Sequence, residues 1–87
     1  MKKVKVLLEK YKFQYHRSYI EDGIEHSCYF DKCWGPEGGA RFIVNLYEDK
    51  IEIYRTGKYF PSMPLLYSIQ LKDFAKIKKA IKRLYYA

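Results

Sequence analysis

Residues 41–55 read RFIVNLYEDKIEIYR, and this stretch decides the fold. Apolar side chains at positions 42, 44 and 46 alternate with the positions between them, which is the period of a strand with one buried face. The acidic pair Glu48-Asp49 interrupts this pattern, and residues 50–55 resume it with Ile51 and Ile53 on the apolar side. The pattern therefore predicts an antiparallel hairpin at the centre of the molecule.

A second hairpin is predicted on the N-terminal side of the first one. Residues 13–20 and 24–30 both alternate, and the dipeptide Asp22-Gly23 between them favours a tight turn because glycine accepts positive φ. Strict alternation places one set of side chains on a common face of the first strand: Phe13, Tyr15, Arg17 and Tyr19. On the return strand it places another set together: Ile24, His26, Cys28 and Phe30.

The C-terminal end carries the clearest helical pattern, at residues 72–86. Its apolar stripe recurs at helical spacing and lysines cover the remaining surface. We expect Asp73 in the first turn and Lys82-Arg83 near the last turn, which suits the helix dipole. Residues 65–70 form a last predicted strand. Residues 2–11 fit helical and strand spacing equally well, and their Leu, Glu and Lys content favours a short helix.

Together these elements predict one α+β domain spanning residues 1–87. An antiparallel sheet of four to five strands, built from two hairpins, is packed by a C-terminal amphipathic helix and a short N-terminal helix. A chain of 87 residues buries little apolar surface, so a homodimer is a natural way to add stability. We find no membrane-spanning segment and no targeting segment, and expect a cytoplasmic protein.

Charge is the strongest functional signal. The chain carries 17 Lys and Arg against 10 Asp and Glu, a net charge of +7. Residues 1–20 are net +5, residues 21–52 are net −5, and residues 53–87 are net +7. We expect the fold to gather both basic ends onto one surface that attracts polyanions. A solvated basic surface with no dedicated ligand is the plainer interpretation.

Ten tyrosines and one tryptophan exceed what so small a core can bury. Rings beside cations hold single-stranded nucleic acid, because bases stack on rings while cations neutralise phosphates. Tyrosine is also a good strand former, and protein-binding surfaces use Tyr, Trp and Arg as readily. The candidate nucleic-acid-binding residues are Arg41, Arg55, Lys58, Tyr47, Tyr54, Tyr59 and Tyr67 on the sheet, with Lys78, Lys79 and Lys82 on the C-terminal helix.

The C-terminal half resembles a known family. Residues 50–55, KIEIYR, and residues 68–81, SIQLKDFAKIKKAI, are similar to the core of transcriptional coactivator and Whirly-type single-stranded DNA-binding domains. Leu71, Phe74, Ile77 and Ile81 fall where the helix of that family keeps apolar residues. The resemblance implies a ββββα unit, usually dimeric through its helices, that grips single strands on a curved, basic, aromatic sheet.

The two histidines and two cysteines lie close together in the sequence, as His16-x9-His26-x-Cys28-x4-Cys33. Zinc takes four such ligands, which makes a zinc site a minor hypothesis. The chain lacks the Cys-x2-Cys spacing of common zinc sites, and we favour a buried Cys28 beside a half-exposed His26. We expect no resident metal, no cofactor and no catalytic residue.

We therefore expect a small, non-catalytic nucleic-acid-binding domain that prefers single strands. A second interpretation is a small protein-binding inhibitor or adaptor, of viral or phage origin, with Trp34 inserting into a pocket of its protein partner. A third is a small nuclease or toxin that uses His16 and His26 as general acid and base.

Overall fold

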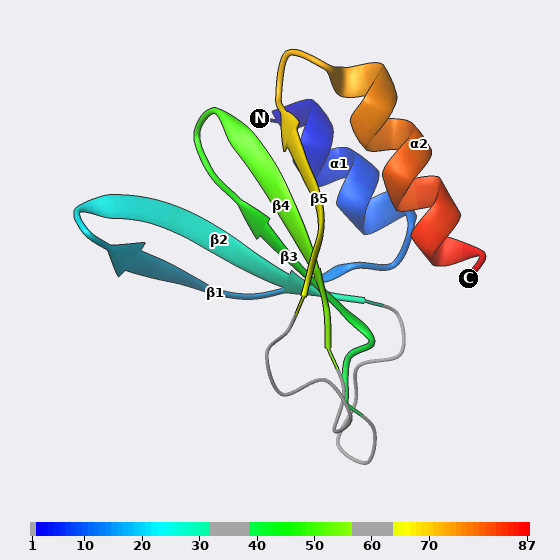
Figure 1. The fold of residues 1–87 in the computed structure, drawn as a ribbon, viewed down its shortest axis with the longest axis horizontal. Coiled ribbons are helices and arrows are strands. Elements are labelled where there is room, and N and C mark those ends of the chain that lie inside the picture. The colour runs from blue at the N-terminus through cyan, green and yellow to red at the C-terminus, as the bar shows by residue number, and fades with distance from the viewer. Residues whose placement is uncertain (1, 32–38, 57–63) are drawn as a thin grey trace.

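The computed structural model describes residues 2–31, 39–56 and 64–87. The elements run in the order α1 (Lys2–Lys10), β1 (Gln14–Glu21), β2 (Ile24–Phe30), β3 (Phe42–Leu46), β4 (Lys50–Arg55), β5 (Leu65–Gln70) and α2 (Phe74–Tyr85) (Figure 1). This arrangement is an antiparallel five-stranded sheet with a helix at each end of the chain, so the predicted α+β fold is confirmed.

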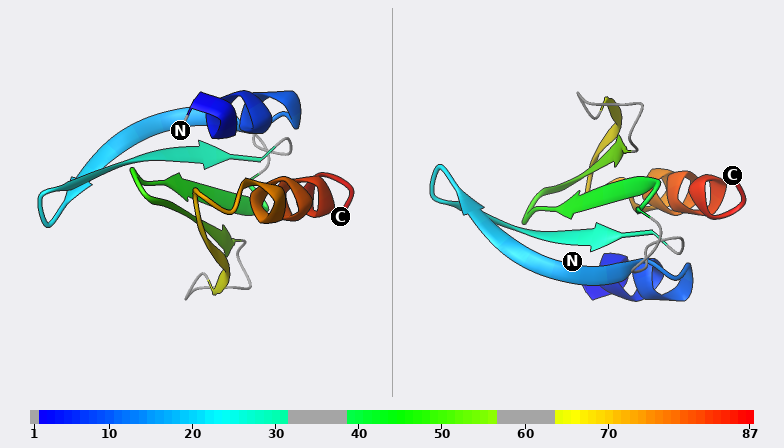
Figure 2. Two further views of the ribbon diagram at one scale, coloured as in Figure 1. Left: turned by 90° about the horizontal axis from the view of Figure 1, so that it is seen from above. Right: turned by 90° about the horizontal axis from the view of Figure 1, so that it is seen from below.

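The sheet is a meander, because each strand pairs antiparallel with its neighbours in the order β1-β2-β3-β4-β5. The predicted turn joins β1 to β2, with φ of 53° at Asp22 and 77° at Gly23. Two successive positive φ values are the signature of a type I′ turn, whose twist matches that of the strands it joins. The β1–β2 hairpin reaches out beyond the helices (Figures 1 and 2).

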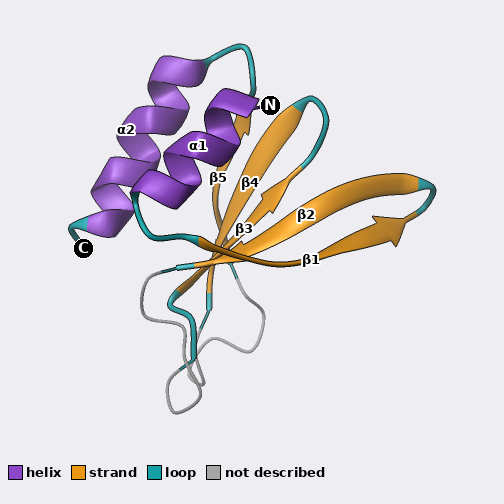
Figure 3. Cartoon of the chain, turned by 180° about the vertical axis from the view of Figure 1, so that it is seen from behind, coloured by secondary structure: helices purple, strands orange, loops and turns teal. Residues whose placement is uncertain are grey.

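Both helices pack on the same face of the sheet and lie side by side (Figure 3). The core lies between them and the sheet, and its fully buried members include Leu8 of α1, Ile77 and Ile81 of α2, and Ile51 and Ile53 of β4. Burial of this apolar surface is the main favourable contribution to folding. Within the described residues no helix lies on the opposite face of the sheet, so the side chains there are available for other contacts (Figure 3).

Helix α1 settles the ambiguity in residues 2–11. Val4, Leu7 and Leu8 are buried while Val6 is 58% exposed, so helical spacing is the one the fold uses. The helix ends in a Schellman motif, in which the Phe13 N–H donates to the Leu8 carbonyl at 2.9 Å. Lys12, with φ of 68°, takes the left-handed position that glycine usually occupies.

Helix α2 begins two residues later than the sequence predicts. Asp73 is the N-cap residue and lies outside the first turn, which contains no acidic side chain, and its side chain makes no capping hydrogen bond. The backbone of Asp73, with φ of −93° and ψ of 54°, is not helical. Just before it, the Leu71 N–H donates to the Asp49 carbonyl at 2.9 Å. The expected Lys82 and Arg83 do lie in the last turn.

The strict alternation predicted for the first strand is wrong at one point of β1. The register shifts between Tyr15 and Arg17, so a bulge at His16 moves Tyr15 to the other face from Arg17 and Tyr19. Tyr15 contacts the buried Tyr29 edge to face, with ring centroids 5.7 Å apart. Arg17 and Tyr19 therefore lie on the face that the helices leave uncovered.

Candidate nucleic-acid interface

Charge separates by layer in this fold. Residues 2–12 and 72–87, which form the helical layer and its ends, carry eleven Lys and Arg against two Asp and Glu, a net charge of +9. Residues 13–71, which form the sheet and its connections, carry six basic against eight acidic residues, a net charge of −2. The two basic ends thus meet as expected, and they meet on the helix side of the sheet.

The predicted tyrosines and arginines divide between the two faces. Tyr47 and Tyr54 lie on the uncovered face, whereas Arg55 and Tyr67 point to the helix side. The Arg55 guanidinium lies 5.3 Å from the centre of the Phe42 ring. The alternation of side chains along a strand explains this division. Arg55 is two and four residues after Ile53 and Ile51 on β4, so it faces the same side as they do, and Tyr67 pairs with Ile53 across the two strands. Lys58, Tyr59, Trp34 and Cys33 lie outside the described residues.

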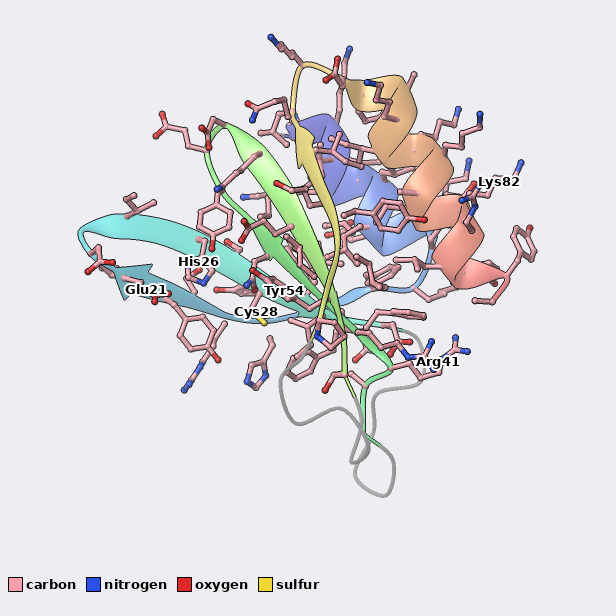
Figure 4. All side chains as sticks on the ribbon, in the orientation of Figure 1. Glu21, His26, Cys28, Arg41, Tyr54 and Lys82 are labelled. Carbon is pink, nitrogen blue, oxygen red and sulfur yellow. The ribbon has the colours of Figure 1, made fainter. Side chains whose placement is uncertain are left out.

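Arg41 has a structural role. Its backbone N–H donates to Oδ1 of the buried Asp31 at 3.0 Å, and its Nε donates to Oδ2 at 3.2 Å. One terminal nitrogen also donates to the Ala87 carbonyl at 3.0 Å. These contacts hold the Arg41 guanidinium in place and connect the end of β2 to Ala87. Figure 4 labels Arg41 on the ribbon.

A groove between β5 and α2 brings an aromatic ring and cations together. It encloses about 260 Å³, with Tyr67, Ile69 and Ala80 as its apolar lining and Lys76, Lys79 and Arg83 as its cationic lining. Residues 76, 79, 80 and 83 recur at helical spacing, so they share one face of α2. None of the residues that line this groove carries a negative charge.

A shallower hollow continues the cationic surface along α2. It encloses about 400 Å³ and shares Lys76 and Lys79 with the groove, while Lys78 and Lys82 add two further cations. The predicted residues Lys78, Lys79 and Lys82 are all exposed on this helix. Lys76 and Arg83 were not among the residues predicted from the sequence, although their spacing around the buried Ala80 places them on the side of α2 that meets the sheet.

The uncovered side of the sheet is called here the open face, and it carries Arg17, Tyr19, Glu21, His26, Cys28, Phe30, Ile43, Asn45, Tyr47, Glu52 and Tyr54. Three of its rings stack across the strands: Tyr19 on His26 with centroids 5.5 Å apart, and His26 on Tyr47 at 4.7 Å. Cations flank the stack, with Arg17 4.3 Å from the Tyr19 centroid and Lys50 5.1 Å from that of Tyr47.

Carboxylates make the open face electrostatically unlike the groove. The Tyr54 hydroxyl donates to Glu52 Oε1 at 3.0 Å, and Lys50 forms a 3.4 Å ion pair with the same carboxylate. Burial raises the pKa of Tyr47 to about 12, with further contributions from the charge of Glu52 and from its hydrogen bond. Charges on this face are mixed in sign, so the helix side is the better surface for a polyanion.

The histidine and cysteine cluster does not assemble into a metal site within the described residues. Among these residues, no group of three or more His, Cys, Asp or Glu side chains converges. His16 stacks on Phe30 with centroids 4.5 Å apart, while His26 lies in the ring stack described above. Cys28 is buried as predicted, and burial raises the pKa of its thiol. His26 was expected to be half-exposed, but it is only 6% exposed because Tyr19 and Tyr47 cover its ring.

Comparison with known proteins found no matching family model, no matching curated protein and no matching solved structure. Within the part of the chain that the structure describes, no helix has the length and apolar character needed to cross a bilayer. The groove and the open face are therefore the two surfaces whose geometry and charge bear on function.

Proposed function

We propose that this protein is a nucleic-acid-binding domain that prefers single strands and binds them along the groove between β5 and α2. The observation that carries the proposal is the composition of the groove: one tyrosine ring with apolar neighbours, three cations, and no acid. Single strands are bound in this way, with bases on rings and phosphates on lysine or arginine. This site retains Tyr67 and Lys79 from the sequence-based set and adds Lys76 and Arg83.

The half-buried position of Tyr67 supports the preference for single strands. Its ring packs against the core on one side and borders the groove on the other. A base reaches such a ring only after it leaves its own stack, which costs little in a single strand and a few kcal/mol in a duplex. The groove can therefore accept an unstacked base more readily than a paired one.

The lysines beyond the groove supply affinity that does not depend on sequence. Lys78 and Lys82 extend the positive surface along α2. Each phosphate neutralised in a single strand releases counterions and adds about −0.7 to the slope of log affinity against log salt. We expect a slope of about −2 to −4 for the intact protein, from three to five such contacts.

The direct experiment measures anisotropy of labelled oligonucleotides of about twelve nucleotides, single-stranded and duplex, across a range of salt. The double variant Lys79→Gln/Arg83→Gln should bind single strands at least about tenfold more weakly, with a slope smaller by about 1.4. The matched control Lys3→Gln/Lys5→Gln removes the same charge from exposed positions on α1 and should change affinity by less than about threefold.

Substitutions of Tyr67 distinguish the contribution of ring stacking to binding from the contribution of charge. Tyr67→Phe keeps the ring and should bind like the wild type, whereas Tyr67→Leu should lose about five- to a hundredfold, as removal of one stacked base does. Negligible binding at about 50 mM salt would refute the proposal. Equal losses in the groove double variant and in the α1 control would show that only net charge matters and that the groove is not the site.

A further inference from the structure

The open face contains a second concave site, remote from the groove. It is a hollow of about 420 Å³ between β1, β2 and β3, within the size range of small-ligand sites. Rings of Tyr19, His26 and Phe30 and the side chains of Cys28 and Ile43 form its apolar walls. Two polar residues, Glu21 and Asn45, also line it, from the strands on either side of β2.

Three polar groups of this hollow have no partner within the described part of the protein. Nδ1 of His26 is buried and makes no hydrogen bond there. The side-chain amide of Asn45 and the carboxylate of Glu21 likewise have no hydrogen-bond or ion-pair partner among the described residues. Buried polar groups in native proteins are nearly always satisfied, so the imidazole nitrogen calls for an explanation.

The stacked rings restrict how a partner can reach that nitrogen. Tyr19 and Tyr47 lie against the two faces of the His26 ring, at interplanar angles of 19° and 29°. A ligand must therefore approach Nδ1 at the edge of the imidazole. His26 also borders a more polar hollow on the helix side, near Lys5, Glu25 and Glu48, so the two sides need separate tests.

We propose that the open-face hollow binds a guanine-type base, with Glu21 accepting from its adjacent N–H donors and Asn45 meeting its O6 and N7 acceptors. Among nucleobases, guanine presents two neighbouring donors on one edge, the ring N1–H and the 2-amino group, and these match the two oxygens of one carboxylate. Its O6 and N7 form an acceptor pair, which an amide NH2 can meet. Rings of Tyr, Phe and His are the surfaces on which unstacked bases lie.

The charge of the hollow selects the form of the ligand. Glu21 is the only Asp, Glu, Lys or Arg among the residues that line the hollow, and it repels a phosphate placed beside it, while Arg17 and Glu52 carry opposite charges elsewhere on the same face. A neutral nucleoside is therefore preferred to its monophosphate, the reverse of what the groove on the helix side prefers. The site is independent of the proposed function, because none of its lining residues is shared with the groove.

The test is titration of guanosine into the ¹⁵N-labelled protein, followed by calorimetry and by amide shifts. We expect saturable binding with shifts at Ile43 and Asn45, and a change in the ¹⁵N shift of His26 Nδ1. Inosine, which lacks the 2-amino donor, should bind at least about tenfold more weakly, the loss expected for one charge-assisted hydrogen bond. Guanosine monophosphate should also bind more weakly than guanosine, because Glu21 repels its phosphate.

Single substitutions show whether guanosine binds in the open-face hollow. Glu21→Gln should weaken guanosine binding at least about tenfold, since the amide cannot accept both donors. The matched control Glu25→Gln makes the same change on the same hairpin but on the helix-side hollow, and should leave binding unchanged. Lys79→Gln should also leave guanosine binding unchanged, so that failure here and failure of the groove can be told apart. No binding at millimolar guanosine, equal binding of inosine, or a loss confined to Glu25→Gln would overturn the proposal.

Discussion

The two faces of the sheet differ in both packing and charge. The helix-covered face buries Ile51, Ile53 and Val44 completely, and its outer layer is strongly basic. The open face leaves Ile43, Asn45 and Tyr54 half-exposed and carries charges of both signs. Since most of the apolar burial is on one side, the other side can keep polar groups without partners at a cost the fold tolerates.

This division separates residues that hold the fold together from residues available for binding. The basic groove lies where α2 meets the sheet edge, so it depends on elements that also form the core. The described residues that line the hollow on the open face come from the β1–β2 hairpin and from β3. Perturbations of the core should therefore affect the groove and the whole fold together, whereas perturbations of the hairpin should act on the hollow.

The largest expected contrast compares two isoleucines on opposite faces. Ile51→Ala removes a fully buried side chain between sheet and helices and should lower the free energy of unfolding by about 2–5 kcal/mol. Ile43→Ala, at a half-exposed position of the open face, should cost less than about 1.5 kcal/mol, since little cavity forms there. Urea denaturation of both variants measures the difference. Equal losses would show that the open face is covered in solution.

The sheet and α2 were predictable because their signals are local. Alternation at positions 42–46 and 50–55, the Asp22-Gly23 turn and the stripe of α2 all identify their elements without reference to distant residues. Helix α1 was ambiguous because Val4 and Leu8 satisfy both periods. Only packing against the rest of the fold, which buries Leu7 and exposes Val6, separates them.

The groove and the open-face hollow could not be predicted in this way, because they are formed by residues that are distant in the sequence. A bulge at His16 carries no composition signal, yet it decides that Tyr15 and Arg17 face opposite ways. Tyr67 meets Lys76 and Arg83 only because β5 takes the outer position and α2 returns across it. Residue types therefore suggested rings beside cations, but the sequence alone did not show which ring lies beside which cation.

The next contrast concerns glycines at the two ends of the sheet. Gly23, with φ of 77°, forms the turn of the hairpin that carries Glu21 and His26. Gly23→Ala should cost about 1–2 kcal/mol, because a Cβ disfavours the left-handed conformation. Gly39→Ala places its methyl where no heavy atom of the described residues beyond its chain neighbours lies within 4 Å, and it should leave stability within about 1 kcal/mol of the wild type. Thermal unfolding of both variants measures this difference, and similar losses would show that the hairpin turn is not under this constraint.

A substitution of His26 tests whether the open face contains a group that destabilises the fold. His26→Phe preserves the stack with Tyr19 and Tyr47 and removes the buried nitrogen that lacks a partner. The substitution should raise the free energy of unfolding by about 1 kcal/mol, since an unsatisfied polar group no longer has to be buried. A loss of stability on His26→Phe would mean that the imidazole already has a partner in solution.

The last contrast is a pH dependence that belongs to the open face. Burial and the neighbouring Glu52 raise the pKa of Tyr47 to about 12, above the ordinary value of 10.0 for tyrosine. The native state therefore holds this proton more tightly than the unfolded state. The stabilisation is complete below pH 10 and is lost as the pH rises through about 12. Titration of one such group changes the free energy of unfolding by at most about 1.4 kcal/mol per pH unit.

Tyr47→Phe removes this titration and should make the loss of stability between pH 10 and 12 shallower. The slope should not vanish, because burial also raises the pKa of Tyr29 and Tyr54. Tyr11→Phe is the matched control, since Tyr11 packs at the helix side against Tyr85 and lies outside the open face. Denaturation across alkaline pH, with tyrosinate absorbance as a second readout, compares the two variants. If both give the wild-type slope, the alkaline transition arises elsewhere and the open face does not hold the Tyr47 proton.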